Sequence, residues 1–370
     1  MPEIAPDELG PFKIIHIHEP SVNLRGILVV DNVARGPSIG GLRMAPDVSE
    51  TECFRLARAM TLKNAASDLP HGGGKSVVFG DPRMPRDEKE PMLRAFACAL
   101  AEVEQYIFGP DMGTDEECMG WVRDEIGRAV GLPSEIGGIP LDELGATGWG
   151  LLHAIEVAAD ASDMPLNGAR IAVQGFGAVG RHAARFLAEQ GAVIVAAADS
   201  GGTVSCGSGL DVAQLTALKQ EGGSVTDYSG SGAVIGDTDA IIDVPCEVWI
   251  PAARPDVIRE DNLQRLDTRM VVPGANIAVT AGAEKALHER GVLCLPDFIV
   301  NAGGVICAAM EYQGASANTA FQAIEDKLRN NVGAVLDIVN RESLTPREAG
   351  VQLALARVRK AMDMRRWSLF

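Results

Sequence analysis

The apolar positions of the chain follow two different periods, which predict strands and helices in turn. Residues 12–34 form two apolar runs joined by a polar turn, as a pair of strands does. From Glu50 the apolar residues recur every three to four positions until Pro70, and Ser49 and Glu52 have the spacing of a capping box. A capped helix is therefore predicted over this stretch.

Two glycine-rich stretches flank the predicted helix. Gly40 and Gly41 belong to the segment GPSIGGLRM, which is predicted to be a loop that approaches a ligand. Glycines 72–74 are predicted to form a turn that leads directly into the buried strand SVVF.

Two lysines stand where an ammonium is unusual. Lys63 lies at the border of the apolar stripe of the helix, and Lys75 follows glycines 72–74. If both face one cleft, repulsion and desolvation lower the pKa of one lysine, which then acts as a base or amine near neutral pH, while the other holds an anion. Taken singly, such a lysine often only reaches water, and such glycines often only form a turn, so the combination carries the prediction.

A carboxylate follows in the same predicted domain. Asp111 comes after a short apolar run within GPDMGT, at a predicted strand end, where it is well placed for proton transfer. An ordinary turn aspartate is the alternative interpretation. Thr114 and Glu117 have the spacing of a second capping box, which predicts the start of the next helix.

The pattern changes after residues 130–147, which are rich in Gly and Pro and predict a domain boundary. Thr147 is predicted to cap a helix. A buried strand, the motif GFGAVG, a helix closed by Gly191 and a second strand ending at Asp199 then follow in order.

This G-x-G-x-x-G context predicts a dinucleotide site. Its glycines suit a tight turn, close approach to pyrophosphate and packing of the helix whose N-terminus attracts phosphates. The residues assigned to this loop are Gly175, Gly177, Ala178, Val179 and Gly180. Asp199, 24 positions after the first glycine, is predicted to bind a ribose 2′-hydroxyl and repel a 2′-phosphate. NAD is therefore favoured as the cofactor, although nearby Ser200 and Arg181 leave NADP open.

Strands and helices then alternate, which predicts an α/β protein of two domains with a C-terminal helical tail. Residues 1–140 are expected to form an N-terminal α/β substrate domain, residues 145–325 a Rossmann-type doubly wound dinucleotide-binding domain, and residues 326–370 helices that pack back on the first domain. Loops at strand ends are expected to contact the cofactor, among them the one that contains Ala252.

Composition narrows the class of partner and the compartment. A formal net charge of -17 disfavours nucleic acid or an anionic membrane as partner. The seven cysteines are odd in number and scattered, as expected of reduced thiols in the cytoplasm. No apolar leader or membrane span is predicted. His16 and His18 lack neighbouring carboxylates or thiols, so no metal site is predicted.

The motifs, taken in order, resemble the glutamate/leucine/phenylalanine/valine dehydrogenase family over residues 20–320 or more. The matching segments are GGLRM, MTLKNA, LPHGGGKSVVFGDP, GPDMGT, GATGWG, GFGAVG, PGAN and PDFIVNAGGV. The resemblance implies NAD(P)-dependent oxidative deamination of an L-amino acid to a 2-oxo acid and ammonium, without a metal. It also implies a homo-oligomer built through the first domain.

The resemblance implies a role for each matching residue. Lys63 would hold the substrate α-carboxylate, Lys75 would be the low-pKa lysine that assists water attack on the imino intermediate, and Asp111 would transfer the proton of the amine. The other implied contacts are Gly40 and Gly41 in the substrate loop, Thr147 and Asn276 at the nicotinamide end, and Asn301 at the cleft.

Departures from the family pattern predict the substrate side chain. Members that use glutamate have a lysine just before GGLR and a serine in the helix after NAGG, where this chain has Ile39 and Ala308. Burying a free carboxylate against these two residues would cost several kcal/mol. Gly109 leaves room at the same pocket, so an apolar or bulky uncharged amino acid such as leucine, valine or phenylalanine is predicted. The segment GATGWG, however, is closer to the glutamate members.

The sequence leaves three other functions open. A glutamate dehydrogenase could use another cation, such as Arg43, in its pocket. A catalytically silent NAD-binding regulator could keep the fold, but it would not need Lys63, Lys75 and Asp111 together. A 2-hydroxy acid dehydrogenase would need a His/Arg pair, for which His71 alone is a poor candidate.

Overall fold

The computed structural model describes residues 5–365, which form two compact units. The first unit contains residues 5–141, 305–320 and 351–365, and the second contains 142–304 and 321–350. The sequence predicted that the whole tail from residue 326 returns to the first domain, but its first part belongs to the second unit.

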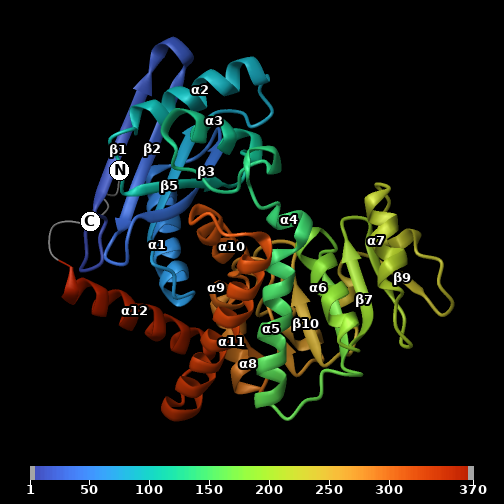
Figure 1. Cartoon of the computed structure of the whole chain (residues 1–370). Helices are drawn as coiled ribbons and strands as arrows, with labels where there is room; N and C mark the ends of the chain where they lie inside the picture. The colour runs from blue at the N-terminus through green and yellow to red at the C-terminus, as the bar shows by residue number, and fades with distance from the viewer. Residues whose placement is uncertain (1–4, 366–370) are drawn as a thin grey trace. The chain divides into compact units, whose positions relative to one another are not determined.

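The first unit is built on a mixed five-stranded sheet with the order β1-β2-β4-β3-β5 (Figure 1). Its strands are β1 (Lys13–Glu19), β2 (Leu24–Asn32), β3 (Ser38–Ala45), β4 (Gly72–Phe79) and β5 (Tyr106–Pro110). β3 lies between β4 and β5 and is parallel to both, while β2 is antiparallel to β1 and β4. The carboxyl ends of β3, β4 and β5 therefore lie at the same end of the sheet.

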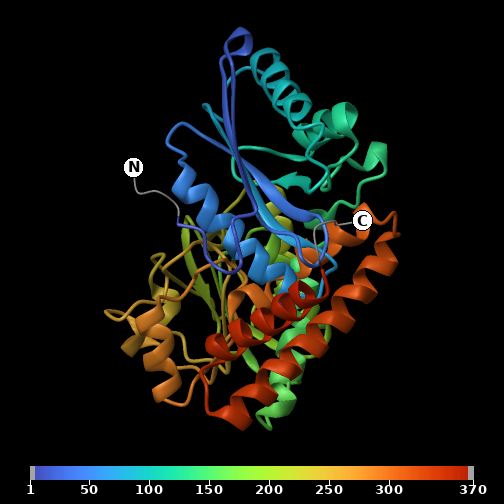
Figure 2. The same ribbon diagram turned by 90° about the vertical axis from the view of Figure 1, so that its left-hand side faces the viewer.

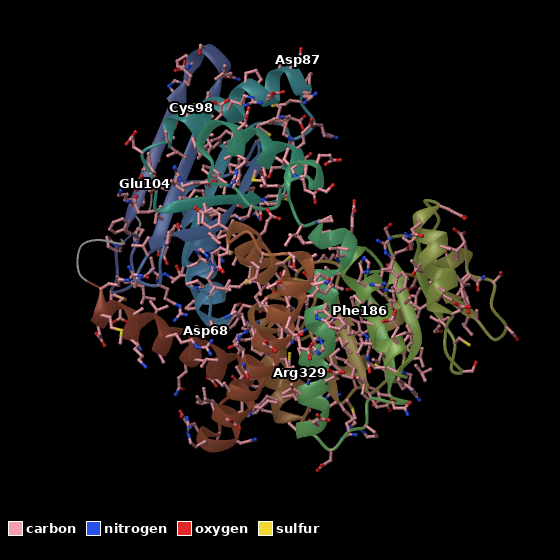
Figure 3. The ribbon with its side chains drawn as sticks, viewed as in Figure 1. Asp68, Asp87, Cys98, Glu104, Phe186 and Arg329 are labelled. Carbon is pink, nitrogen blue, oxygen red and sulfur yellow. The ribbon has the colours of Figure 1, made fainter. Side chains whose placement is uncertain are left out.

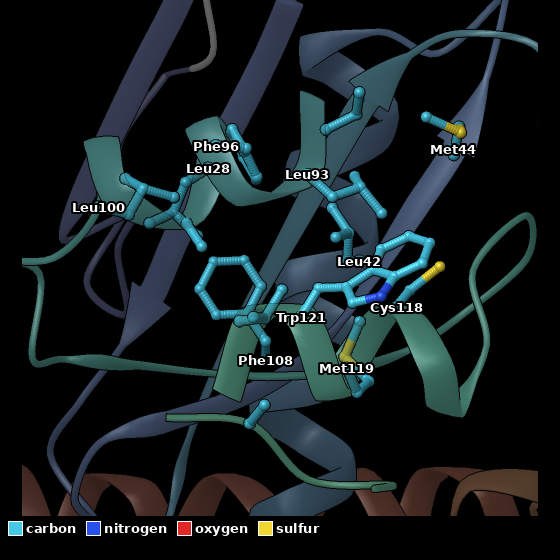
Figure 4. Packing of buried hydrophobic residues seen from close by; sticks show 14 of the residues in the cluster. Leu28, Leu42, Met44, Leu93, Phe96, Leu100, Phe108, Cys118, Met119 and Trp121 are labelled. Atoms are coloured by element: carbon cyan, nitrogen blue, oxygen red, sulfur yellow. The ribbon is translucent and has the colours of Figure 1, made fainter. Parts of the chain in front are cut away.

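Helices cover both faces of this sheet. Figure 2 shows α1 (Glu50–Ala66) on the opposite side of the strands from α2 (Arg86–Ala99). α3 (Glu116–Ile126) lies on the same face as α2, and the apolar core on that face is drawn in Figure 4. Leu42 and Phe108 point into this core. Because successive strand residues point to opposite faces, Gly41 and Gly109 face the side of α1.

The glycines predicted to form a loop and a turn lie inside β3 and β4 instead. A Cβ on Gly40 would lie 1.8 Å from the carbonyl oxygen of Gly74. A Cβ on Gly73 would lie 2.0 Å from the amide nitrogen of Thr61 in α1. These positions lack a side chain because a strand or a helix approaches their backbone, and not because the chain turns there.

Side-chain caps start α1 and α3, although neither matches its prediction in full. Ser49 accepts a hydrogen bond from the Glu52 amide, as predicted, but no reciprocal bond closes the box. At α3 the cap is Asp115, which accepts from the Cys118 amide. Thr114 does not cap this helix because its hydroxyl donates to the Leu42 carbonyl at 2.7 Å.

The second unit contains a seven-stranded sheet with the order β12-β11-β10-β6-β7-β8-β9. The parallel strands are β6 (Arg170–Gln174), β7 (Val193–Asp199), β10 (Val248–Pro251), β11 (Met270–Val271) and β12 (Leu293–Cys294). Two antiparallel strands, β8 (Gly202–Ser205) and β9 (Val234–Gly236), extend one edge. The predicted α/β class, with a Rossmann-type second sheet, is confirmed.

Helices pack around this second sheet. They include α5 (Ala146–Ala161), α6 (Ala178–Glu189), α7 (Val212–Gln220), α8 (Ala281–Glu289) and α9 (Asp297–Val300). The N-cap of α5 is Gly145, with φ +83°, so Thr147 lies in the first turn and does not cap the helix as predicted.

The C-terminal region is helical, as predicted. Its elements are α10 (Gly303–Tyr312), α11 (Ala317–Glu342) and α12 (Pro346–Met364), and a short α4 (Leu141–Leu144) lies earlier in the chain. Arg329 of α11 forms an ion pair with Glu156 of α5, and Phe186 of α6 packs edge-on against Trp149 of α5; Arg329 and Phe186 are labelled in Figure 3. The ion pair fastens the first part of the tail to α5 within the second unit, whereas the ring contact joins α5 to α6.

Two further findings concern cysteines and membranes. All seven cysteines are free, and all except Cys98 are buried. Within residues 5–365, no helix combines the length and apolarity that crossing a bilayer requires.

The close approach of α1 to β4 makes a stability prediction. Gly73→Ala is expected to lower the free energy of unfolding by about 1–3 kcal/mol, or to prevent folding, because the new methyl group meets backbone. Gly109→Ala is the matched control, since its Cβ would meet only the Val130 Cγ2 atom, at 3.5 Å, and the Gly40 carbonyl oxygen, at 3.9 Å. Urea unfolding of both variants measures the difference, and equal stabilities would contradict the packing described here.

Candidate active site

One face of β3, β4 and β5 carries most of the residues predicted to act on the substrate. In the register of the sheet, Gly41 lies beside Gly109, and Ile39 lies two residues earlier on the same face. A Cβ on Gly41 would lie 2.9 Å from the Lys75 ammonium and 2.7 Å from the Asp111 Cβ. Gly41 therefore leaves the space in which these two side chains meet.

Lys75, in the middle of β4, and Asp111, directly after the carboxyl end of β5, form an ion pair. The Lys75 Nζ donates to Asp111 Oδ1 at 2.6 Å. Arg43, which follows Gly41 by two positions on β3, donates from Nε to Asp111 Oδ2 at 2.7 Å. The same guanidinium donates to Glu52 of α1 at 2.6 Å, so two cations and two carboxylates alternate in one network.

Burial and neighbouring charge perturb this pair. Lys75 is 4% exposed, and desolvation lowers its pKa, which Asp111 raises again in part and Arg43 lowers further. Desolvation opposes ionisation of Asp111, but the charges and hydrogen bonds of Lys75 and Arg43 outweigh it and lower the pKa of this carboxyl. Asp111 is therefore ionised at neutral pH, beside an amine that releases its proton more easily than an ordinary lysine.

Lys63 lies in the last turn of α1 and is half-buried. Its neighbour Asn64 donates to the carbonyl oxygens of Gly72 at 2.6 Å and Ile39 at 3.2 Å, which fixes this turn of the helix against the starts of β3 and β4. The sequence predicted that repulsion between Lys63 and Lys75, together with desolvation, lowers the pKa of one of these lysines. Desolvation is the largest cause of the lowered pKa of Lys75, and Arg43 is a cation that lowers it further.

The glycine motif of the second unit adopts the geometry that a phosphate loop needs. Gly175 has φ +97°, and a Cβ on Gly180 would lie 1.9 Å from the Gly175 carbonyl oxygen. A Cβ on Gly177 would meet nothing within 4 Å, so the backbone is open to a ligand there. No side chain within residues 5–365 caps the N-terminus of α6, where Ala178 and Val179 form the first turn. The amides of this turn are therefore suited to bind pyrophosphate.

A cavity of about 580 Å³ adjoins this loop. The residues that line it include Gly175, Gly177, Asp199, Lys219, Ala252 and Arg254. Its size and its position at the carboxyl ends of β6, β7 and β10 fit a dinucleotide.

Four donors of its own unit hold the Asp199 carboxylate. Oδ1 accepts from the Gly201 amide and the Ser224 hydroxyl, both at 2.8 Å. Oδ2 accepts from the Lys219 ammonium at 2.7 Å and the Val225 amide at 3.0 Å. A carboxylate has about four acceptor positions, so a ribose hydroxyl would have to displace one of these donors.

The residues assigned to the nicotinamide end occupy neighbouring loops of the second unit. Asn301 donates to the Asn276 side-chain oxygen at 2.8 Å and to the Gly274 carbonyl at 3.4 Å. A Cβ on Gly303 would lie 2.9 Å from the Thr147 Cα, which places Thr147 beside the NAGG segment. Ala308, by contrast, is buried in the part of α10 that belongs to the first unit.

The sequence interpretation missed the contact of Arg43 with Asp111. The sequence suggested Arg43 only as a cation that could bind a glutamate side chain. Arg43 lies two positions after Gly41 and four after Ile39, so all three residues face the same side of β3. This placement could have been found if GGLRM had been interpreted as a strand instead of a loop.

The comparisons with known proteins agree with the two-unit architecture. Residues 14–128 match the family described as Glu/Leu/Phe/Val dehydrogenase, dimerisation domain, and residues 137–366 match Glutamate/Leucine/Phenylalanine/Valine dehydrogenase.

Individual relatives cover most of the chain. The NADP(+)-dependent glutamate dehydrogenase of Pyrobaculum calidifontis is 36% identical over 92% of this chain and 86% of its own length. The NAD-specific glutamate dehydrogenase A of Halobacterium salinarum is 33% identical over 90% of this chain and 80% of its own. The structure of hetero-hexameric glutamate dehydrogenase from Thermus thermophilus, in a Leu-bound form, superimposes with a TM-score of 0.84 at 29% identity, covering 97% of this chain and 91% of that one.

Fold and site define a two-unit dehydrogenase with a dinucleotide loop in one unit and a buried lysine–aspartate pair in the other. The chain belongs to the glutamate/leucine/phenylalanine/valine dehydrogenase family. It is an NAD(P)-dependent amino acid dehydrogenase that acts on CH–NH2 donors.

The network around Asp111 predicts a shift in pH dependence. Removing the positive charge in Arg43→Gln lets Lys75 hold its proton more tightly, so the pKa of Lys75 rises. The increase of kcat/KM with pH that follows loss of this proton is expected to move to higher pH by roughly one unit. Arg94→Gln, which removes an arginine that pairs with Glu90 and Glu125, is the control and leaves the profile in place. An unchanged or lower midpoint in Arg43→Gln would contradict the assignment.

Proposed function

We propose that this dehydrogenase oxidises an uncharged, apolar L-amino acid such as leucine, valine or phenylalanine, and catalyses the reverse reductive amination. The Lys75–Asp111 pair, on a strand face that continues to Ile39 and Gly109, is the observation that carries the proposal. The first unit supplies the groups that bind and react with the substrate, and the second unit binds the cofactor.

The pair matches the proton transfers that deamination requires. The substrate amine must lose a proton before hydride can leave Cα, and the ionised Asp111 accepts it. A nicotinamide cofactor held by the loop at Gly175 and Gly177 would supply the acceptor for this hydride. Lys75 then takes a proton from the water that attacks the resulting iminium carbon, and this step requires an amine whose pKa is below the ordinary lysine value. Asp111 then returns its proton to the nitrogen of the resulting carbinolamine. As the C–N bond breaks, the carbinolamine hydroxyl gives its proton to the Asp111 carboxylate, so that ammonia leaves and the carbonyl of the 2-oxo acid forms. Lys63 is proposed to bind the α-carboxylate.

The residues beside the pair favour an uncharged side chain. Ile39 is buried and lies on the same face of β3 as Gly41. Gly109 lies beside Gly41 on the neighbouring strand β5. Gly109 presents no side chain to this face, and a Cβ there would still meet only ordinary contacts. Ala308 supplies no hydrogen-bond donor. A substrate carboxylate placed here would lose its hydration without gaining a partner.

Glutamate is the second candidate, because the two relatives described above and the Thermus protein are named glutamate dehydrogenases. It would require a cation in the pocket. Arg43, the cation suggested by the sequence, already donates to Asp111 and Glu52, so its charge is compensated. For this reason the uncharged substrate is preferred.

The environment of Asp199 supports use of NAD with weak discrimination against NADP. Asp199 is ionised, because Lys219 and three other donors outweigh its desolvation and lower its pKa. Lys219, which lines the same cavity, compensates its charge, so a 2′-phosphate would meet a cation as well as a carboxylate. NAD and NADP are therefore expected to give kcat/KM values within roughly tenfold of each other, equivalent to about 1.4 kcal/mol.

A homo-oligomer is proposed as the working form. The first unit contains the segment that matches a domain described as a dimerisation domain, and the relative from Thermus thermophilus is hetero-hexameric.

A panel of L-amino acids, assayed with both cofactors, tests the proposed substrate. Leucine, valine or phenylalanine is expected to exceed glutamate in kcat/KM by roughly 100-fold or more, as several kcal/mol of desolvation implies. Higher kcat/KM with glutamate would refute the proposal.

Two variants at residue 39 sharpen this test. Ile39→Lys, combined with Ala308→Ser, is expected to reverse the preference toward glutamate, because it adds a cation and a hydroxyl where the wild-type protein has neither. Ile39→Met with Ala308→Ser is the control, since it keeps position 39 uncharged and retains the preference for the apolar substrate.

A further inference from the structure

Glu311 is a buried carboxylate in a part of the first unit that the reaction described above does not use. It is the only charged residue in the sequence of α10, GGVICAAMEY, and it is 8% exposed. Its oxygens bind three backbone amides: Oε1 accepts from Gly131 at 2.8 Å and Leu132 at 3.2 Å, and Oε2 accepts from Ile139 at 2.7 Å. One side chain thereby fastens α10 to both ends of the loop 131–139.

That loop supports the strand end on which Asp111 stands. The backbone before it continues the sheet, because the Val130 amide donates to the Phe108 carbonyl at 2.8 Å. Gly131 has φ +70°, and a Cβ on it would lie 2.6 Å from the Pro110 ring. Pro110 directly precedes Asp111. A shift of the loop would therefore press on, or release, the residue next to the proton-transfer carboxylate.

The same loop and helix border the substrate side-chain pocket. The Val130 Cγ2 atom lies 3.5 Å from the position a Cβ on Gly109 would take. Ala308 is one helical turn before Glu311, so the two residues lie on adjacent positions of one face of α10. The three hydrogen bonds of Glu311 thus fix α10, and with it Ala308, relative to the strand end that carries Gly109 and Asp111.

We propose that Glu311 is a positioning residue that sets both the alignment of Asp111 and the width of the pocket for the substrate side chain. This inference rests on the proposed function, because it takes the face of Gly109 and Ala308 as the side-chain pocket. Glu311 touches no reacting atom. It acts through the loop 131–139, whose amides it binds.

Glu311→Gln tests the proposal with little change of volume. The amide oxygen can still accept from Gly131 and Leu132, but the amide nitrogen meets the Ile139 N–H, so one of the three bonds is lost. Misalignment is expected to lower kcat by roughly 10- to 100-fold. The ratio of kcat/KM for the best substrate to that for alanine is expected to fall by about fivefold or more, because a looser pocket distinguishes side chains less well. Glu311→Asp, which is too short to reach all three amides, is expected to act in the same direction.

Glu247→Gln is the matched control. The carboxylate of Glu247 also accepts from a backbone amide, that of Arg170 at 2.7 Å, but it does so in the second unit. Its substitution leaves the ratio unchanged. A purely structural role of Glu311 would lower the fraction of active enzyme and reduce all rates equally, so an unchanged ratio would overturn the proposal. Failure of both Glu311 variants to fold and bind NAD would also overturn it.

The ratio of kcat/KM for the best substrate to that for alanine distinguishes failure of the role of Glu311 from failure of the proposed function. The wild-type panel is measured first, and the ratio is formed with whichever amino acid the wild-type enzyme uses best. If that amino acid is glutamate, the proposed function fails while the role of Glu311 is still tested. If it is apolar and the Glu311→Gln ratio equals that of the wild-type enzyme, only the role of Glu311 fails.

Discussion

The proposed chemistry depends on a buried lysine ammonium that is paired with one carboxylate. Burial lowers the pKa of Lys75, and the Asp111 carboxylate raises it. Arg43 shares the carboxylate and shifts the balance toward proton loss. The first unit is built so that these groups can meet: Gly41 lacks the side chain that would fill their space, and Gly73 lets α1 lie close enough for Glu52 to hold the other end of Arg43.

The second unit also keeps a carboxylate ionised at a strand end, with a different set of donors. Asp199 ends β7 beside the cofactor cavity, where an unpartnered carboxylate would repel phosphate. Lys219 and three further donors stabilise its charge and fasten the neighbouring loop. Both units therefore keep an ionised carboxylate at a strand end by surrounding it with donors. In the first unit one of those donors, Lys75, is itself proposed to react.

Local features of the sequence were sufficient to predict the glycine loop and to single out Lys75 and Asp111, which the structure brings into one ion pair. Gly175 and Gly180 serve a turn and a helix contact a few residues away, so their spacing alone reveals them. The roles of Gly41 and Gly73 could not be predicted, because the atoms that exclude a side chain there come from Lys75 of β4, from Pro110 and Asp111 at the end of β5, and from α1. Glu311 was missed for the same reason: it binds an amide 180 positions earlier in the chain.

A pH titration of Lys75 in the folded enzyme is the most direct test of the proposed chemistry. The rate at which an amine-reactive reagent labels Lys75, followed by mass spectrometry across a pH series, gives its pKa in the folded enzyme. The account predicts a pKa below the ordinary value of 10.5, and a still lower one in Asp111→Asn, which removes the group that raises it. A Lys75 that titrates at or above 10.5 in the wild-type enzyme would contradict the account.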